Sequence, residues 1–357
     1  MADSALERLA YCGNSYQLFG VEEQRLVGGR ADGLRVLEVK NGRGLQLSIL
    51  LDRGCGIARL SYKGINCSFL SASGLRHPAY FEYQQGGFLR NFHAGFLTNS
   101  GIFNVGVDGE DDGEELFLHG DLDNTPATSF SHDIVTDDDG KSFIEIKATI
   151  PVERIGYHKV VLKRTFRVAL EDDYFTIHDH FTNTGSTTCP MMLLYHMNMG
   201  YPLLDQDAQL FINSSSIKPR TELAAGETEK WAEILPPTPN YPERCYYHDF
   251  AKRADATAAI YQPKHDIGLA ISFDNAQLPY FCEWKQYGYR DYTLGLEPGN
   301  SHCDGRAKMR ADGTLQFLEP QESKDYDIKV TLFSGKERFA QLQQSVTAGE
   351  HKLEPLE

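Results

Sequence analysis

Apolar residues recur at every second position in many short segments, and this alternation restricts the fold of the chain more than any other feature. Side chains of a β-strand point alternately to opposite faces, so a period of two predicts strands with one buried face. Gly, Asp, Asn and Pro separate the segments, as expected at turns. The segments lie at 34–40, 45–52, 57–64, 143–152, 158–170, 174–183, 256–262, 268–274, 292–298 and 326–333.

Turn and helix signals complete the prediction of the fold. Asn41-Gly42 separates the first two segments and predicts a hairpin. Helical patterns are short and lie at 5–10, 227–234 and 337–346. The 357 residues show no repeat, linker or break in composition. We therefore expect one all-β domain over residues 1–357, with a core at about 34–333, that folds as a large sandwich with a few short helices.

Charge and cysteine content narrow the expected partners and compartment. The formal charge of −15 repels phosphate backbones and anionic lipid, so neither nucleic acid nor membrane is an expected partner. The seven cysteines are odd in number and have no CxxC spacing, which argues against a disulfide framework or a cysteine zinc knuckle. The start of the chain lacks the basic and apolar pattern of a signal peptide. We expect a cytoplasmic protein.

Two motifs with possible cofactor chemistry are weak. Gly54-Cys55-Gly56 is followed by a predicted strand, whereas a dinucleotide site needs a helix there. His178 and His180 share a face of a predicted strand and could bind one metal ion. The residues that follow, Phe181 to Thr184, lack the glutamate that would complete such a site. A polar strand face is the favoured interpretation of this pair.

A glycine-rich and aromatic segment, 86–106, has the composition of a sugar site. It places Arg90, Asn91 and His93 among aromatic residues, which could stack on a sugar ring while the polar groups bind hydroxyls. An ordinary turn with core aromatics explains the same residues equally well. His119 lies at a predicted strand end, directly before a glycine.

Three residues further along the chain are candidates for acid–base chemistry or sugar stacking. His196 lies in an apolar strand, where a histidine is usually a core residue, although the following Asn, Gly and Pro favour a loop mouth. Glu297 ends a strand before Pro-Gly, and burial there would raise its pKa toward that of a general base. A structural carboxylate is an equal alternative. Trp284 could stack on a sugar, but a core role is favoured.

Taken in order, these residues resemble the aldose 1-epimerase, or galactose mutarotase-like, superfamily. LHG carries His119, TNTG precedes the strand with His196 and its YHMNMGYPLL loop, and LEP carries Glu297. The DRG turn at 52–54, FLRNFHAGF and GLEPGN are similar to a divergent branch known only as a domain of unknown function. The resemblance covers roughly residues 34–333.

The resemblance implies a β-supersandwich with a carbohydrate cleft and a mechanism without metal or organic cofactor. Glu297 would take the proton of the anomeric hydroxyl, His196 would protonate the ring oxygen, and His119 would bind and polarise the sugar. Arg90 would be the substrate-binding arginine. Further sugar contacts are expected from Asn91, His93, Asn300 and Trp284. The expected partner is a small carbohydrate, and a homodimer is compatible with this interpretation.

The sequence also departs from the superfamily pattern. Tyr195 stands where an asparagine usually precedes the histidine, which predicts a pocket unlike that of a galactose enzyme. We expect Arg90, Asn300, His302 and Arg306 to meet an anionic substituent of the substrate. Two other functions stay open: a non-catalytic carbohydrate-binding protein, and a metal-dependent sugar isomerase that uses His178 and His180. Lyase or hydrolase chemistry is a further alternative.

Overall fold

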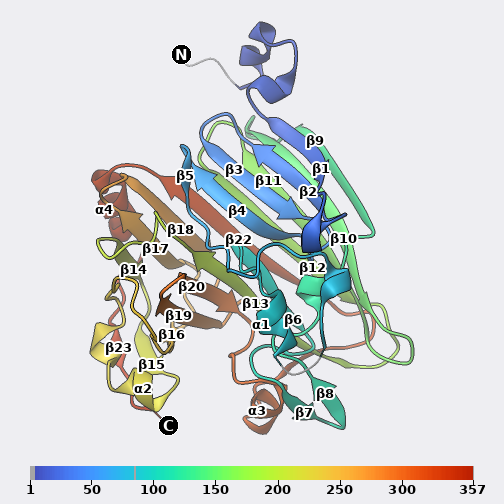
Figure 1. The fold of residues 1–357 in the computed structure, drawn as a ribbon, viewed down its shortest axis with the longest axis vertical. Helices are drawn as coiled ribbons and strands as arrows, with labels where there is room; N and C mark the ends of the chain where they lie inside the picture. Colours follow the sequence, from blue (N-terminus) through green and yellow to red (C-terminus); the bar gives the residue numbers. More distant parts are fainter. Residues whose placement is uncertain (1–4, 84–85, 357) are drawn as a thin grey trace.

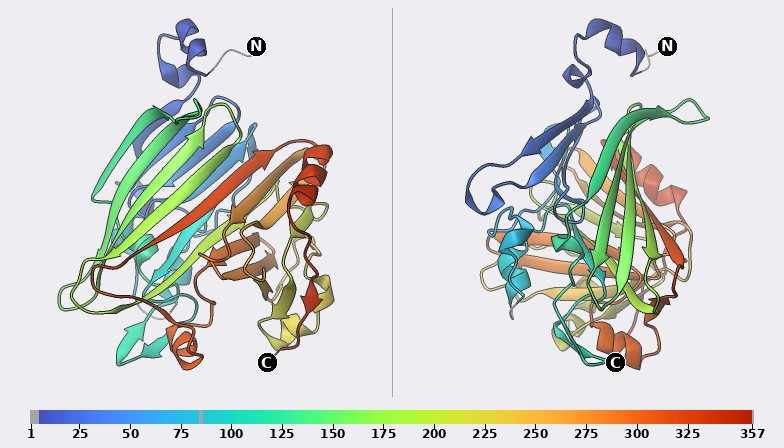
Figure 2. Two further views of the ribbon diagram at one scale, coloured as in Figure 1. Left: turned by 180° about the vertical axis from the view of Figure 1, so that it is seen from behind. Right: turned by 90° about the vertical axis from the view of Figure 1, so that its right-hand side faces the viewer.

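The computed structural model describes residues 5–83 and 86–356, and two large β-sheets dominate this part of the chain (Figure 1). Figure 2 shows the sheets packed against each other as two layers. One apolar cluster with residues from both sheets fills the space between them. The predicted all-β architecture with a few short helices is confirmed.

The first sheet contains the strands that carry the candidate site. Its strands are antiparallel except for the last pair. In spatial order they are β1 (Gly20–Arg25), β2 (Arg35–Lys40), β3 (Leu45–Leu50), β4 (Gly56–Tyr62), β6 (Leu97–Ile102), β13 (Cys189–Met199), β20 (Asp291–Gly299), β19 (Tyr280–Gly288), β16 (Arg244–Asp249), β15 (Ser216–Pro219) and β23 (Lys352–Leu353), with β5 (Ile65–Asn66) beside β4 and β21 (Gln316–Leu318) beside β13.

The second sheet is antiparallel and closes the other side of the core. Its order is β14 (Gln209–Ile212), β17 (Ala256–Gln262), β18 (Ile267–Phe273), β22 (Ser323–Phe333), β12 (Tyr174–Asn183), β11 (Lys159–Ala169), β10 (Ser142–Glu153) and β9 (Ser129–Thr136). A separate hairpin consists of β7 (Gly109–Asp111) and β8 (Glu114–Leu116).

Helices are short and lie outside the sheets (Figure 1). The α-helices are α1 (Gly87–Asn91), α2 (Glu222–Ala225), α3 (Arg306–Ala311) and α4 (Lys336–Ser345). Single 3₁₀ turns occur at Glu7–Tyr11, Ser15–Gln17, Gly29–Ala31, Pro78–Tyr80, Leu122–Asn124 and Thr228–Lys230. None of the helices in the described ranges has the length and apolarity that a membrane crossing requires.

The period-two segments all form strands, and the hairpin at Asn41-Gly42 joins β2 to β3 as predicted. The helix predicted over 227–234 is wrong, because only the 3₁₀ turn Thr228–Lys230 forms. The ammonium group of Lys285 donates to the carbonyl oxygens of Lys230 and Trp231, which a longer helix would use for its own hydrogen bonds. The N-terminal helix is likewise only a 3₁₀ turn.

Strand parity on β12 and β13 decides which side chains face the core. Asp179 points inward and binds the Arg164 guanidinium through both carboxylate oxygens, at 2.7 and 2.6 Å. Tyr195 on β13 donates its hydroxyl to the same carboxylate at 2.7 Å. This buried network ties the two sheets together, and it turns the adjacent residue, His196, to the opposite face of the first sheet.

Candidate active site

A row of functional side chains crosses the outer face of the first sheet, one on each of several neighbouring strands. The register of β13 and β20 pairs Met197 with Leu296, so His196 lies next to Glu297. Glu297 in turn is paired with Cys282 on β19. Residues directly opposite in an antiparallel pair have their side chains on the same face, about 5 Å apart. A hairpin, β19–β20, and the distant strand β13 therefore present their side chains at one place.

One contact in this row joins a carboxylate to an imidazole. His196 Nδ1 and Glu297 Oε1 are 3.2 Å apart, and both side chains are buried. The two atoms are not aligned as a hydrogen bond, and neither has an aligned partner among the described residues. Buried polar atoms are nearly always hydrogen-bonded in folded proteins. A buried acid and base left without partners are therefore the mark of a site that a ligand completes.

Burial shifts both groups toward their neutral forms. The loss of solvent, followed by the electrostatic effect of neighbouring thiols, raises the pKa of Glu297 well above its usual value. Burial lowers the pKa of His196 to about 4. The resting pair therefore holds one transferable proton, on the carboxyl group, beside an imidazole that can accept one.

Gly295 provides the space for the Glu297 carboxylate. It is two residues before Glu297 on β20 and pairs with Trp284. A Cβ atom at this position would overlap Glu297 Oε1 and press on the side chain of Trp284. The absence of a side chain at 295 is thus a condition for the observed position of the carboxylate.

His119 reaches the same place from a loop after β8. It has a positive φ of 61°, unusual for a residue with a side chain, and its ring centre is 5.4 Å from that of His196. The backbone N–H of Gly106 donates to its Nδ1 at 3.4 Å, so the ring proton resides on Nε2. Burial and the nearby His196 lower the pKa of His119 well below its usual value. The neutral ring therefore offers a donor at Nε2.

Aromatic rings form walls around these polar groups. Phe92, which directly follows α1, and Trp284 on β19 lie edge-on to His196, with ring centres 5.4 and 5.3 Å from that of His196. Phe88 on α1 stacks on Phe92 and contacts His119. Trp284 is held by a hydrogen bond from Nε1 to Glu243 at 2.8 Å. These rings supply flat apolar surfaces of the kind on which sugar rings stack.

Together the groups line a pocket of about 270 Å³. This volume is at the small end of ligand sites, which suits a monosaccharide better than a longer chain. The pocket is lined by Phe88, Leu89, Phe92, Gly106, Val107, Leu118, His119, His196, Arg220, Glu243, Cys245, Cys282, Trp284, Glu297 and Cys303.

Four of the eight residues predicted for the site meet in this pocket: His119, His196, Trp284 and Glu297. The structure places three others away from it. Arg90 is on the exposed side of α1 and pairs with Glu82 at 2.7 Å, because the apolar side of this short helix faces the pocket. Asn91 donates to the backbone oxygen of Gly87 at 2.8 Å. His93 is buried against Arg53, and burial, followed by the charge of Arg53, lowers the pKa of His93 well below its usual value.

The eighth residue, Asn300, ties strands together beneath the surface. Its amide accepts from the N–H of Leu193 at 2.6 Å and donates to the backbone oxygen of Met191 and the hydroxyl of Tyr326, at 3.1 Å each. With these three bonds the side chain is engaged within the protein, so the pocket is lined without it.

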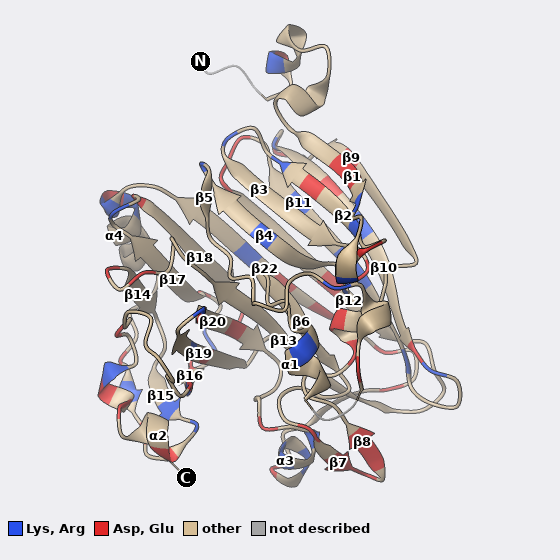
Figure 3. Cartoon of the chain, in the orientation of Figure 1, with Lys and Arg blue, Asp and Glu red and all other residues tan. Residues whose placement is uncertain are grey.

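The cluster expected to meet an anionic substituent does not form. Arg306 is buried and pairs with Asp111 and Glu114 of the β7–β8 hairpin, which Figure 3 shows as an acidic patch. The ring of His302 packs against two tyrosines. These residues follow the end of β20, in a segment whose Cys303 lines the pocket while His302 and Arg306 do not. Arg220, which sequence reasoning did not single out, is the arginine that lines the pocket instead.

His178 and His180 lie on the outer face of the second sheet, since they alternate with the inward-pointing Asp179. Their Nδ1 atoms are 2.8 and 2.7 Å from the carboxylates of Asp327 and Asp325 on β22. Both imidazoles are partly exposed. The pair is therefore part of a polar strand face, remote from the pocket on the other sheet.

Sequence reasoning missed Phe88, Phe92, Arg220, Glu243, Cys245, Cys282 and Cys303 as pocket residues. The strands β16 and β19, which carry Cys245 and Cys282, were not predicted either. Alternation in RCYYHD and YFCEWKQYG was the available signal, but their aromatic and charged residues obscure it.

The fold and this site define a galactose mutarotase-like β-sandwich. The chain belongs to the family described as "Domain of unknown function (DUF4432)", whose family model matches residues 31–332. The resemblance read from the sequence is confirmed. A search of curated proteins finds no match.

Three solved structures illustrate the shared fold. The crystal structure of "a putative aldose 1-epimerase" from Klebsiella pneumoniae is 23% identical, with a TM-score of 0.85 over 95% of this chain and 93% of that one. A galactose mutarotase-like protein from Clostridium acetobutylicum is 14% identical, with a TM-score of 0.61 over 89% and 100%. Galactose 1-epimerase from Lactobacillus acidophilus is 12% identical, with a TM-score of 0.58 over 89% and 99%.

Proposed function

We propose that this pocket is the active site of an aldose 1-epimerase-like isomerase, which interconverts the anomers of a small sugar or sugar derivative without a cofactor. The observation that carries the proposal is the contact of His196 with Glu297 at 3.2 Å, in which both buried groups keep unused hydrogen-bonding capacity. The aromatic walls and the volume of the pocket support a monosaccharide as the ligand.

The reaction requires one proton to leave the anomeric hydroxyl and another to reach the ring oxygen. Ring opening then gives an aldehyde, rotation about the C1–C2 bond exposes its other face, and closure returns both protons. The pair in its resting state has one donor, the Glu297 carboxyl, and one acceptor, the neutral His196 imidazole. Each group that acts as the acid in opening acts as the base in closure, so no external proton is consumed.

This order reverses the first step implied by the superfamily resemblance, in which Glu297 is the base. A sugar hydroxyl that hydrogen-bonds to the carboxylate would favour its ionised form and move the proton to His196, which restores the implied order. Both orders use the same two groups and the same single proton. Loss of either side chain is therefore expected to stop turnover.

His119 and the aromatic walls would hold the ring between these groups. The Nε2 donor of His119 can bind a sugar oxygen, and its neutral ring adds no charge to repel a proton from His196. Trp284 and Phe92 can pack against the apolar face of a pyranose. A sugar held in this way has its reacting oxygens beside an acid and a base in a nearly dry pocket.

The test is saturation-transfer NMR between the anomers of a panel of neutral and anionic aldoses, in the presence of a chelator. We expect the wild-type protein to accelerate exchange for at least one sugar, and the Glu297→Gln and His196→Gln variants to lose this acceleration. Sugar binding without accelerated exchange would contradict the proposal and favour a carbohydrate-binding protein.

A further inference from the structure

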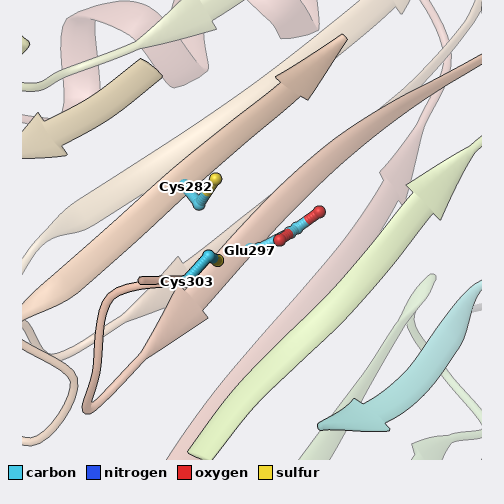
Figure 4. Close-up of side chains that lie close together, drawn as sticks. All are labelled: Cys282, Glu297 and Cys303. Carbon is cyan, nitrogen blue, oxygen red and sulfur yellow. The ribbon is translucent and has the colours of Figure 1, made fainter. Parts of the chain in front are cut away.

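Three cysteines converge at the floor of the pocket, and the proton transfers proposed above do not use them. Cys245 lies on β16, Cys282 on β19, and Cys303 in the loop after β20. The sulfur atoms of Cys245 and Cys282 are 2.9 Å apart. The ligand atoms of Cys282, Glu297 and Cys303 all lie within 4.8 Å of one another, and Figure 4 shows these three side chains on adjoining backbone segments.

Strand register, rather than sequence spacing, produces this cluster. Cys282 is paired with Glu297, and Cys245 is paired with Trp284, two residues along the same face of β19. Cys303 lies in the loop after β20. Arg220 holds this loop by donating to the backbone oxygen of Cys303 and to the carboxylate of Asp304. All seven cysteines of the chain are free thiols, but among the described residues only Cys282 and Cys303 cluster with a carboxylate, and Cys245 joins this cluster through its contact with Cys282.

The cluster also contains an unsatisfied oxygen. Glu297 lines the pocket, and its Oε1 is buried, lies 3.2 Å from His196 Nδ1 and has no aligned hydrogen-bond partner in the described ranges. Thiols are weak hydrogen-bond donors, so the three cysteines cannot satisfy this carboxylate oxygen well. A bound ion would use the oxygen and the sulfurs at the same time.

The geometry points to a binding site for a thiophilic divalent cation, with Zn²⁺ as the first choice, in which Cys245, Cys282 and Cys303 supply sulfur ligands and Glu297 supplies an oxygen ligand. Zinc takes four such ligands in a tetrahedron, with Zn–S distances of about 2.3 Å and Zn–O distances of about 2.0–2.2 Å. Sulfurs in such a tetrahedron are about 3.8 Å apart. The Cys245 and Cys282 sulfurs are 2.9 Å apart here, so the Cys245 side chain would have to rotate to become the fourth ligand beside Cys282, Cys303 and Glu297. Soft thiolate ligands favour zinc over magnesium or calcium.

Binding releases protons and places charge in the pocket. Each thiol loses its proton as its sulfur binds the cation, so affinity rises with pH. Three thiolates and a carboxylate leave an excess of negative charge around a divalent ion. The Arg220 guanidinium beside Cys303 lies close enough to reduce this excess.

A consequence for activity follows, which rests on the proposed function. A cation bound to the Glu297 carboxylate occupies the oxygen that would exchange a proton with the sugar. Zinc is therefore expected to inhibit anomer exchange, and removal of zinc to restore it. Binding of the ion itself does not depend on any turnover.

The test begins with cobalt as a spectroscopic probe. The full-length protein is reduced, freed of metal and titrated anaerobically with Co²⁺. We expect one ion per chain, intense visible bands of tetrahedral cobalt, near-ultraviolet bands from thiolate–cobalt bonds, and displacement by one equivalent of Zn²⁺. A fully reduced protein that gives no thiolate–cobalt bands would overturn the proposal.

Matched serine variants locate the site. Cys282→Ser and Cys303→Ser should weaken cobalt binding at least about 10-fold, the cost of losing even an outer partner of a metal site, and should weaken the thiolate bands. Cys67→Ser is the control, because Cys67 is also buried but lies near β5, with its sulfur near the backbone oxygen of Ile65. Thermal unfolding of the metal-free variants checks that each is folded.

Equal cobalt affinity in Cys67→Ser and Cys282→Ser would also overturn the proposal. The cobalt titration requires no sugar, and the exchange assay is run with a chelator. The metal site and the proposed function are therefore tested independently. Absence of anomer exchange leaves metal binding intact, and absence of metal binding leaves the exchange reaction intact.

Discussion

Replacement of Glu297 by glutamine separates a catalytic carboxylate from a structural one. The amide has nearly the same size and shape, so the packing around β20 is preserved, but it neither donates a proton as an acid nor accepts one as a base. General acid–base transfer typically contributes about 10²–10⁴-fold to a rate. We therefore expect the enzyme-dependent rate of anomer exchange to fall about 10²–10⁴-fold, equivalent to about 3–5 kcal/mol in the activation barrier.

The same variant should not be less stable at neutral pH. The folded state raises the pKa of Glu297 because the carboxyl group is buried, so the folded protein binds more protons than the unfolded chain. The stabilising effect of this shift is present below the unfolded pKa and is lost as pH rises toward the folded value. Glutamine has no proton to lose, so we expect an unfolding free energy at neutral pH that is equal to or greater than that of the wild type.

Glu283 provides a matched control within the same sheet. It is a buried glutamate on β19, and its carboxylate lies 3.2 Å from Nε2 of His248 in an aligned hydrogen bond. This pair is outside the pocket. Glu283→Gln should lower the unfolding free energy and leave anomer exchange unchanged. The reasoning would be refuted if Glu297→Gln kept an exchange rate within about 10-fold of the wild type. It would also be refuted if Glu297→Gln and Glu283→Gln lowered the exchange rate equally.

Three further perturbations test the site and the core. Gly295→Ala should lower the exchange rate by up to about 100-fold with little loss of stability, because the new Cβ displaces the Glu297 carboxylate; a crystal structure of the variant with an unmoved carboxylate and full activity would contradict this. Asp179→Ala should cost about 3–5 kcal/mol in a urea unfolding measurement, because it leaves the Arg164 guanidinium buried without its partner. Burial holds the pKa of His93 well below its usual value. As the pH falls below about 6.5, the unfolded chain takes up a proton at this histidine but the folded protein does not. The stability of the fold is therefore highest above about pH 6.5 and decreases below it. His93→Gln should therefore reduce the slope of unfolding free energy against pH by about 1.4 kcal/mol per pH unit between about pH 6 and pH 5, and an unchanged slope would count against it.

The strands were largely predictable from the sequence because their cause is local. Alternation in ATAAIYQ places every second side chain on one face, and β17 spans the same residues, Ala256–Gln262. At 227–234 only the 3₁₀ turn Thr228–Lys230 forms, and a residue distant in the sequence, Lys285 on β19, donates to the carbonyl oxygens that follow it. Edge strands such as β1 and β9 were missed because solvent lies on much of their surface, so the apolar alternation is weak.

The candidate site was predictable only in part. Residue type and neighbours made His119, His196 and Glu297 candidates, the resemblance to the superfamily gave them roles, and the structure brings them together in one pocket. Arg90 had the right residue type and neighbours, but the orientation of α1 turns it to solvent. The packing of Phe88 on α1 against His119, a residue distant in the sequence, accompanies this orientation.

The sequence by itself determined which segments are strands and which face of each strand is apolar, because these follow from side chains two residues apart. Only the tertiary structure decided that β13 lies between β6 and β20, and that β19 and β16 continue the same sheet. That order places an imidazole, a carboxylate and three thiols within a few side-chain widths of one another. β19 and β20 form a hairpin, but the contacts of β13 with β20 and of β16 with β19 join segments that are distant in the sequence, and their register is encoded by no local pattern.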